Sequence, residues 1–101
     1  MGIIVSNVSF GQITTSTING VITDKNNKKI EHAKVEIILK SKGITRGTFT
    51  DENGRFKFYL IEVGGPYTLK ITKLNYREYN KKNLEFDLGD NDINVKLETE
   101  D

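Results

Sequence analysis

Few side chains in this chain of 101 residues could carry out acid–base or nucleophilic chemistry. His32 is the only histidine, and Ser41 and Thr45 are the first hydroxyl residues that follow it. A general base must lie within hydrogen-bonding distance of its nucleophile, and a single histidine among lysines is usually a surface residue. The absence of cysteine excludes disulfides, thiolate metal sites and cysteine nucleophiles. We therefore predict that the chain is not an enzyme and has no cofactor.

Two groups of carboxylates have the residue types of a calcium site. Residues 51–54, Asp-Glu-Asn-Gly, are similar to the first part of a calcium loop, but the further oxygen ligands of such a loop are missing. The same residues end in Asn-Gly, which is a signature of a tight hairpin turn. Asp87, Asp90 and Asp92 flank a second predicted turn. We interpret both groups as turns and predict no metal site.

An aromatic and basic segment follows residue 75. Its residues Tyr76, Arg77 and Tyr79 are the candidate interaction surface of the chain. An exposed tyrosine ring can stack on a sugar ring or contact a protein partner. In the alternative interpretation, Tyr76 packs at the end of the fold and Tyr79 covers the core. The sequence leaves both interpretations open.

The charge pattern excludes several classes of partner. Lys and Arg number 15 and Asp and Glu number 14, so the formal net charge at pH 7 is +1. This balance does not favour a nucleic-acid-binding surface or a polybasic membrane-binding surface. Gly64-Gly65 is followed by Pro66 and a predicted strand, which excludes a phosphate-binding loop at a helix N-terminus. No apolar run is long enough to span a bilayer, so direct membrane insertion is not expected.

The elements that position these residues are predicted to be strands. β-branched residues favour strands, and 12 Ile, 6 Val and 10 Thr stand against 7 Leu, 1 Ala and 1 Met. Apolar and polar residues alternate in short segments that are separated by Gly, Asn and Asp, with turns predicted at 64–66 and 89–92 among other places. The predicted strands are 17–23, 33–39, 44–50, 55–60, 67–72, 84–88 and 93–97. This pattern predicts an all-β sandwich of antiparallel sheets, with Leu60 and Leu88 among its core residues.

Residues 1–16 differ from the rest of the chain. An apolar segment at 3–8 is followed by Ser9-Phe10-Gly11 before Gln12, which resembles the end of a signal peptide. Because the charged region that begins a signal peptide is missing, the alternatives are a signal-peptide remnant and a flexible N-terminal segment. We predict a β-sandwich domain at 17–98 and an acidic tail at 99–101.

Several short motifs resemble a known family. Residues 18–24, Ile-Asn-Gly-Val-Ile-Thr-Asp, resemble the opening x-x-G-x-V-x-D strand of carboxypeptidase regulatory-like domains. Residues 33–35 are similar to the A-x-V strand of that family, and residues 50–56 are similar to its T-D-x-x-G-x-F segment. The resemblance covers residues 17–98. It implies a seven-stranded Greek-key β-sandwich of the immunoglobulin or transthyretin-like type.

A more specific resemblance lies at residues 63–68, Val-Gly-Gly-Pro-Tyr-Thr. This segment is similar to the N-terminal extension of TonB-dependent outer-membrane receptors of Bacteroidetes, which follows a signal peptide and lies in the periplasm. Two positions depart from the family pattern. His32 replaces the glycine before A-x-V, so the turn there must avoid a positive φ or accept strain. Asn75 replaces the glycine of the family's G-Y pair, and asparagine tolerates the left-handed region.

The resemblance implies a non-catalytic periplasmic accessory domain that acts as a protein-contact module or a spacer. Its expected partners are the plug and barrel of such a receptor or another periplasmic protein. Weak self-association through a sheet edge is a further expectation. Two alternatives remain open, namely a carbohydrate- or peptide-binding sandwich and the regulatory domain of a metallocarboxypeptidase.

Overall fold

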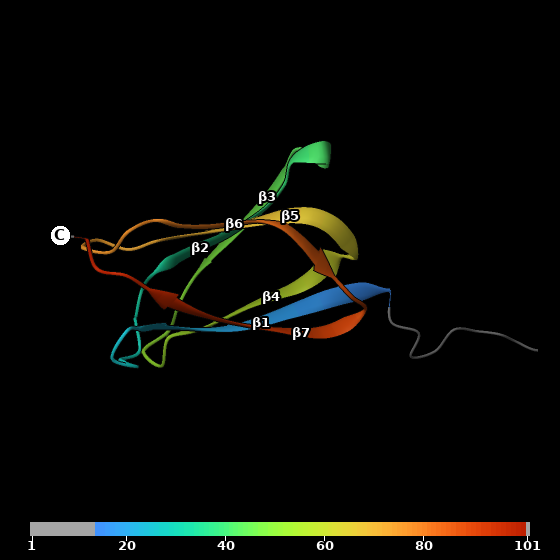
Figure 1. Ribbon diagram of the computed structural model, residues 1–101. Helices are drawn as coiled ribbons and strands as arrows, with labels where there is room; N and C mark the ends of the chain where they lie inside the picture. Colours follow the sequence, from blue (N-terminus) through green and yellow to red (C-terminus); the bar gives the residue numbers. More distant parts are fainter. Residues whose placement is uncertain (1–13, 101) are drawn as a thin grey trace, which may run out of the picture.

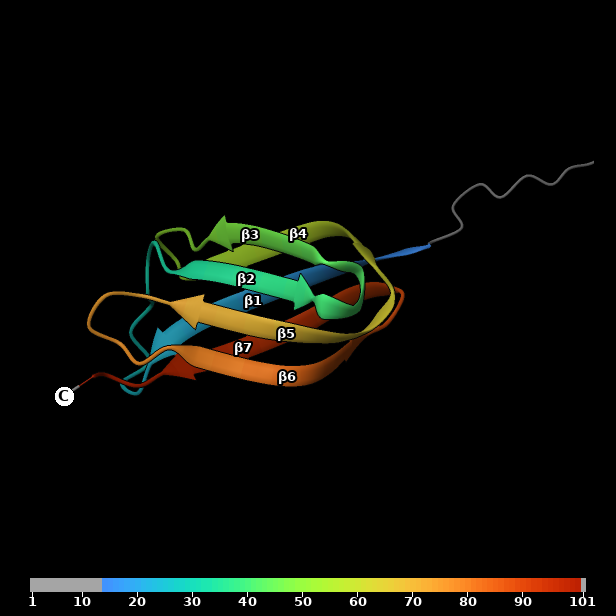
Figure 2. The ribbon, with the colours of Figure 1, turned by 90° about the horizontal axis from the view of Figure 1, so that it is seen from above.

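Two β-sheets face each other in the computed structural model, which describes residues 14–100 (Figures 1 and 2). The strands are β1 (Thr15–Asp24), β2 (Lys34–Leu39), β3 (Ile44–Phe49), β4 (Arg55–Glu62), β5 (Gly64–Thr72), β6 (Tyr79–Phe86) and β7 (Gly89–Leu97). A short 3-10 turn, η1 (Lys40–Lys42), precedes β3. Within residues 14–100, no helix has the length and apolar character needed to cross a membrane. The predicted seven-stranded β-sandwich is confirmed, whereas the predicted signal-peptide end at residues 3–12 lies outside the described residues.

Each sheet combines strands from distant parts of the chain. One sheet has the strand order β4-β1-β7, and the other has the order β3-β2-β5-β6. β1 runs antiparallel to β4 and parallel to β7, and the remaining neighbours pair antiparallel. The parallel pair extends over nine positions, from Ser16–Gly89 to Asp24–Leu97. The first and last strands of the domain therefore lie side by side, and only this pair departs from the antiparallel arrangement.

The core lies between the sheets and follows the alternation along the strands. On β1, the buried positions Ile18, Gly20 and Ile22 alternate with half-buried ones. The buried apolar residues are Ile18, Ile22, Ile30, Ala33, Val35, Ile37, Leu39, Phe56, Phe58, Ile61, Tyr67, Leu69, Ile71, Phe86, Val95 and Leu97. Full burial of one large aliphatic or Phe side chain stabilises a fold by about 1.5–3 kcal/mol. This core holds the sandwich together in a chain that has no cysteine.

Leu60 and Leu88 were predicted to be core residues but are exposed, as is Ile44 at the start of β3, so these predictions were wrong. Leu60 has a φ of 57°, which interrupts the alternation of β4. As a result Leu60 is 75% exposed and Ile61 faces the core in its place. Leu88 lies between the end of β6 and the start of β7, and its side chain is 56% exposed.

Two predicted turns are parts of strands. Residues 64–66 begin β5, and residues 89–92 begin β7, where pairing with β1 keeps them extended. β6 also begins earlier than predicted, at Tyr79. Residues 51–54 do form a tight turn, in which the Gly54 N–H donates a hydrogen bond to the Asp51 carbonyl at 2.9 Å. This turn joins β3 and β4, which belong to different sheets, so the hairpin prediction was wrong.

Candidate functional site

The Thr-Asp-x-x-Gly-x-Phe motif at residues 50–56 closes one end of the sandwich. Thr50 is buried, and its Oγ1 donates a hydrogen bond to the Ile30 carbonyl at 2.7 Å. The same oxygen accepts a hydrogen bond from the Ala33 N–H at 2.8 Å. Buried polar groups need partners of this kind. Thr50 therefore fastens the segment before β2 to the end of β3.

Asp51 caps the turn that follows. Its Oδ1 accepts hydrogen bonds from the backbone N–H of Asn53 at 2.8 Å and of Arg55 at 2.9 Å. The bond from the Arg55 N–H is the main cause that holds the pKa of Asp51 below its ordinary value. No three His, Cys, Asp or Glu side chains within residues 14–100 are grouped so as to hold a metal ion. The carboxylate of Asp51 therefore stabilises the turn by binding backbone N–H groups.

The glycine and phenylalanine of the motif are also explained by the fold. Gly54 has a φ of 73°, and a Cβ there would lie 2.5 Å from the Ile22 carbonyl oxygen. The ring of Phe56 packs against the backbone of Gly20, where a Cβ would overlap the ring atoms. The glycine of the first motif and the phenylalanine of the third therefore fit each other across β1 and β4.

His32 lies apart from the first two hydroxyl residues that follow it in the sequence. It lies just before β2, with a φ of 63°, so the turn accepts the strained conformation that a glycine would adopt freely. Its ring stacks on Phe49, with the ring centres 4.8 Å apart and an interplanar angle of 15°. Ser41 and Thr45 lie beyond or opposite the far end of β2, so the structure does not bring them to the histidine.

The predicted surface of Tyr76, Arg77 and Tyr79 is partly occupied by the fold. Tyr76 and Tyr79 are half-buried and pack against the core. Arg77 is exposed, and its Nη1 lies 3.5 Å from Glu98 Oε1. The backbone N–H of Arg77 also donates to the Glu98 carbonyl at 2.8 Å. The three residues are close together, and the rings of both tyrosines are partly covered by the core.

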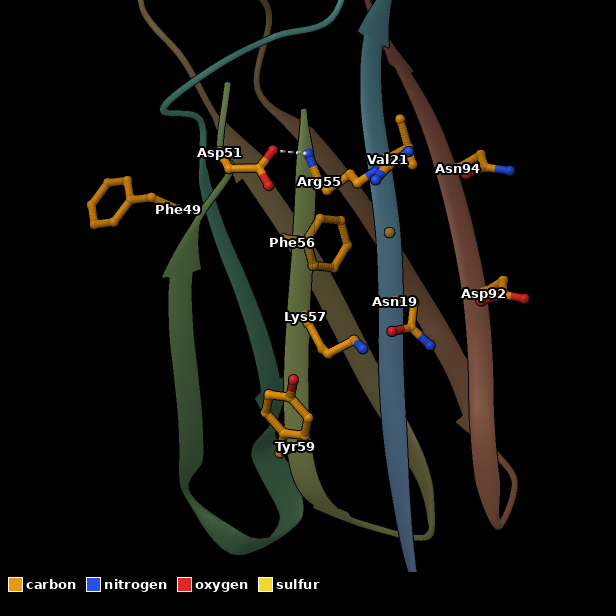
Figure 3. Close-up of a pocket in the computed structure, with 11 residues that line it drawn as sticks. Asn19, Val21, Phe49, Asp51, Arg55, Phe56, Lys57, Tyr59, Asp92 and Asn94 are labelled. Carbon is orange, nitrogen blue, oxygen red and sulfur yellow. Dashed lines mark hydrogen bonds between the residues drawn. The ribbon is translucent and has the colours of Figure 1, made fainter. Parts of the chain in front are cut away.

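A different surface, on the outer side of the three-stranded sheet, forms a hollow of about 690 Å³ (Figure 3). We call it the outer-face hollow. Its lining residues are Asn19, Gly20, Val21, Phe49, Asp51, Arg55, Phe56, Lys57, Tyr59, Asp92 and Asn94. In Figure 3, Arg55 and Lys57 extend from β4 toward β1, and Tyr59 stands beyond them on the same strand. Asp92 and Asn94 project from β7 on the far side of β1.

The pairing of the strands sets these side chains in rows. Each row takes one residue from β4, one from β1 and one from β7. The rows are Lys57–Asn19–Asp92 and Arg55–Val21–Asn94. Sequence reasoning missed this surface, because its members lie far apart in the chain. The available signal was the alternation of each strand, which places these residues opposite the core positions.

A family model described as carboxypeptidase regulatory-like domain matches residues 17–98. No curated protein matches the chain. Among solved structures, catechol 1,2-dioxygenase from Acinetobacter radioresistens is similar, with a TM-score of 0.69 and 16% identity over 89% of this chain and 53% of that one. A putative carbohydrate-binding protein from Bacteroides uniformis has a TM-score of 0.66 and 13% identity, over 82% of this chain and 41% of that one. At such identities, the likeness shows the fold alone.

A third similar structure is a chain of a cohesin–X–dockerin complex from Acetivibrio cellulolyticus. It has a TM-score of 0.62 and 27% identity, over 79% of this chain and 52% of that one. Our chain therefore spans about half the length of these solved structures.

Proposed function

The chain belongs to the carboxypeptidase regulatory-like domain family, and we propose that it works as a non-catalytic accessory domain. The observation that carries this proposal is the use of the motif residues within the fold. Thr50 and Asp51 bind backbone groups, and Phe56 packs on Gly20. The one histidine, His32, stacks on a phenylalanine away from the nearest hydroxyls. The likeness to a dioxygenase concerns the fold and assigns no reaction to this chain.

We further propose that the domain is the periplasmic N-terminal extension of a TonB-dependent outer-membrane receptor. The support is the resemblance of residues 63–68 to the corresponding step in those receptors. This step carries the chain from β4 to β5 in the other sheet. Gly64 has a φ of 103°, and a Cβ on Gly65 would overlap the Leu84 carbonyl. The positive φ of Gly64 and the lack of space for a Cβ at Gly65 therefore explain why glycine occupies both positions.

Within the receptor, the domain would act as a protein-contact module or a spacer. The similar chain from Acetivibrio cellulolyticus belongs to a cohesin–X–dockerin complex, in which it is part of an assembly of proteins. This likeness favours contact with a partner over chemistry. The expected partners are the plug and barrel of the receptor or another periplasmic protein.

An antibody against the 101-residue chain tests this location in fractionated cells of the organism that produces the protein. We expect an antigen much larger than 11.5 kDa in the outer-membrane fraction. Added protease should remove the antigen only after the outer membrane has been made permeable. A soluble antigen of the size of the chain itself would contradict the proposal. Co-purification with a zinc carboxypeptidase would favour the regulatory-domain alternative.

A further inference from the structure

The outer-face hollow contains charged side chains that form no ion pair within the described part of the domain. None of the ion pairs within residues 14–100 involves Arg55, Lys57 or Asp92. Asn19 Nδ2 donates one long hydrogen bond, of 3.3 Å, to Asp90 Oδ1. These groups stand on one face of a rigid three-stranded sheet, so their spacing is fixed by the strand pairing. Their donors and acceptors are available to a ligand.

The charges of the lining balance. Its polar members are the cations Arg55 and Lys57, the carboxylates Asp51 and Asp92 and the amides Asn19 and Asn94. A nucleic acid or an acidic peptide requires an excess of positive charge, which this surface does not offer. A sugar hydroxyl both donates and accepts hydrogen bonds, so neighbouring hydroxyls can use a cation and a carboxylate at the same time. The polar groups therefore match a neutral ligand with many hydroxyls.

An aromatic ring lies beside these groups. Tyr59 is 59% exposed, and Lys57 Nζ lies 5.4 Å from the centre of its ring. In Figure 3, the ring of Tyr59 and the short side chain of Val21 lie among the polar groups and provide apolar surface. The ring of Phe56 is buried in the core. Apolar walls with a few placed polar groups are typical of small-ligand sites, and a volume of about 690 Å³ is within their usual range.

We infer that the outer-face hollow is a binding site for a neutral oligosaccharide. Tyr59 stacks on the apolar face of one sugar ring, and Lys57, Asn19 and Asp92 bind hydroxyls along the row that crosses the sheet. This inference goes beyond the proposed accessory role, and it holds wherever in the cell the domain resides.

NMR titration of the isotope-labelled 101-residue chain tests the inference. The probes are maltohexaose, cellohexaose, xylohexaose and mannohexaose, each to about 10 mM, which covers millimolar affinity. We expect saturable shifts of backbone amides on β1, β4 and β7 with at least one probe. Tyr59→Ala should weaken that binding about tenfold or more, because sugar stacking depends on the ring. The variant should fold, since the side chain is largely exposed.

Lys40→Ala is the matched control, because Lys40 is an exposed residue of η1 outside the hollow. It should leave the affinity unchanged. The inference would be overturned by no saturable shift with any hexaose, by unchanged affinity of Tyr59→Ala, by shifts confined to Tyr76 and Tyr79, or by tighter binding of an oligogalacturonate. Shifts of the same amides with protein concentration alone would identify a second copy of the chain as the occupant, and would also overturn it.

Discussion

At the scale of single residues, the sequence motifs of this domain are explained by contacts within the fold. Thr50 bridges a carbonyl and an N–H group, Asp51 caps a turn, and Gly54 occupies a position with positive φ and no room for a Cβ. Phe56 fills the space above Gly20. A motif of this kind identifies the fold, whereas a function has to be argued from the residues of a particular site.

The Gly20–Phe56 contact gives a stability prediction. In Gly20→Ala the new methyl group would overlap the Phe56 ring, which is buried in the core and cannot swing out freely. We expect the free energy of unfolding to fall by about 1–3 kcal/mol, the usual cost of overpacking. Gly47→Ala on β3 is the control, because the nearest atoms to its new Cβ would lie at an ordinary 3.7 Å. Urea denaturation measures both variants, and equal stabilities would contradict the packing argument.

Thr50 gives a second prediction. In Thr50→Val the shape is kept, but the Ile30 carbonyl and the Ala33 N–H lose a partner in a buried place. Each buried group left without a hydrogen bond costs about 1–3 kcal/mol, so the free energy of unfolding should fall by about 2–6 kcal/mol for the two groups. Thermal and urea unfolding check this value. Thr48→Val, at a half-buried position on β3, should change the stability by less than about 0.5 kcal/mol.

Acid sensitivity follows from the two turn-capping aspartates. Hydrogen bonds from the N–H groups of Arg55 and Lys28 are the main causes that lower the pKa values of Asp51 and Asp24. An aspartate whose pKa is lower in the folded state than its unfolded value of about 3.9 stabilises the fold above that pH. This stabilisation is lost as the pH falls through the folded pKa. Stability should therefore be level near neutral pH and decline below about pH 4.

Asp51→Asn separates this effect from general acid unfolding. The amide oxygen still accepts the two backbone hydrogen bonds but does not titrate, so the acid decline should be shallower than in the wild type. Glu52→Gln, an exposed change in the same turn, should leave the slope unaltered. Urea midpoints at a series of pH values measure the curves. Parallel curves for the wild type and Asp51→Asn would contradict the assignment.

At the scale of elements, alternation predicted most strands and missed features that depend on pairing. Residues 67–72 alternate over their whole length and residues 33–39 do so except at Ile38, and the structure has strands there. Residues 89–92 carry turn-forming Asp and Asn, but pairing with β1 overrides this local preference. The positive φ of Leu60 leaves no mark in the hydrophobic pattern. The outer-face hollow joins residues 19 to 94 across three strands, so only the topology could place them together.

The prediction of weak self-association concerns the edge strands of the sheets. β3 pairs with β2 over six positions without a bulge, is exposed along most of its length, and has Arg46 as its only charge. The opposite edge, β6, carries Lys81 and Lys82 and an irregular register, which protects an edge against pairing. We therefore expect β3 to be the edge through which two copies associate weakly.

Sedimentation equilibrium tests this edge. The average mass of the wild-type chain should rise above 11.5 kDa as its concentration increases. Thr45→Lys places a charge on β3 and should keep the chain monomeric at the same concentrations. Asn80→Lys on β6 is the control and should behave as the wild type does. A mass that rises equally in Thr45→Lys would rule out β3 as the contact.

At the scale of the whole molecule, the parallel pairing of β1 and β7 sets how the domain would carry tension as a spacer. β1 begins at one end of the sandwich, and β7 ends at the other (Figures 1 and 2). A strand of ten residues such as β1 is about 30 Å long. Force applied to the two ends would slide the strands along each other, so the hydrogen bonds of all nine paired positions resist together.

Single-molecule pulling measures this resistance, because the chain has no cysteine and two attachment points can be introduced without interference. Thr14→Cys with Glu98→Cys loads β1 and β7 in shear. Lys25→Cys with Glu98→Cys pulls both strands from the same end, so their hydrogen bonds break one after another. Since forced unfolding depends on the barrier rather than on the equilibrium stability, the shear pair should unfold at a clearly higher force at equal loading rate. Equal forces for the two pairs would show that the parallel pair is not the mechanical element, and the spacer role would then lose its structural basis.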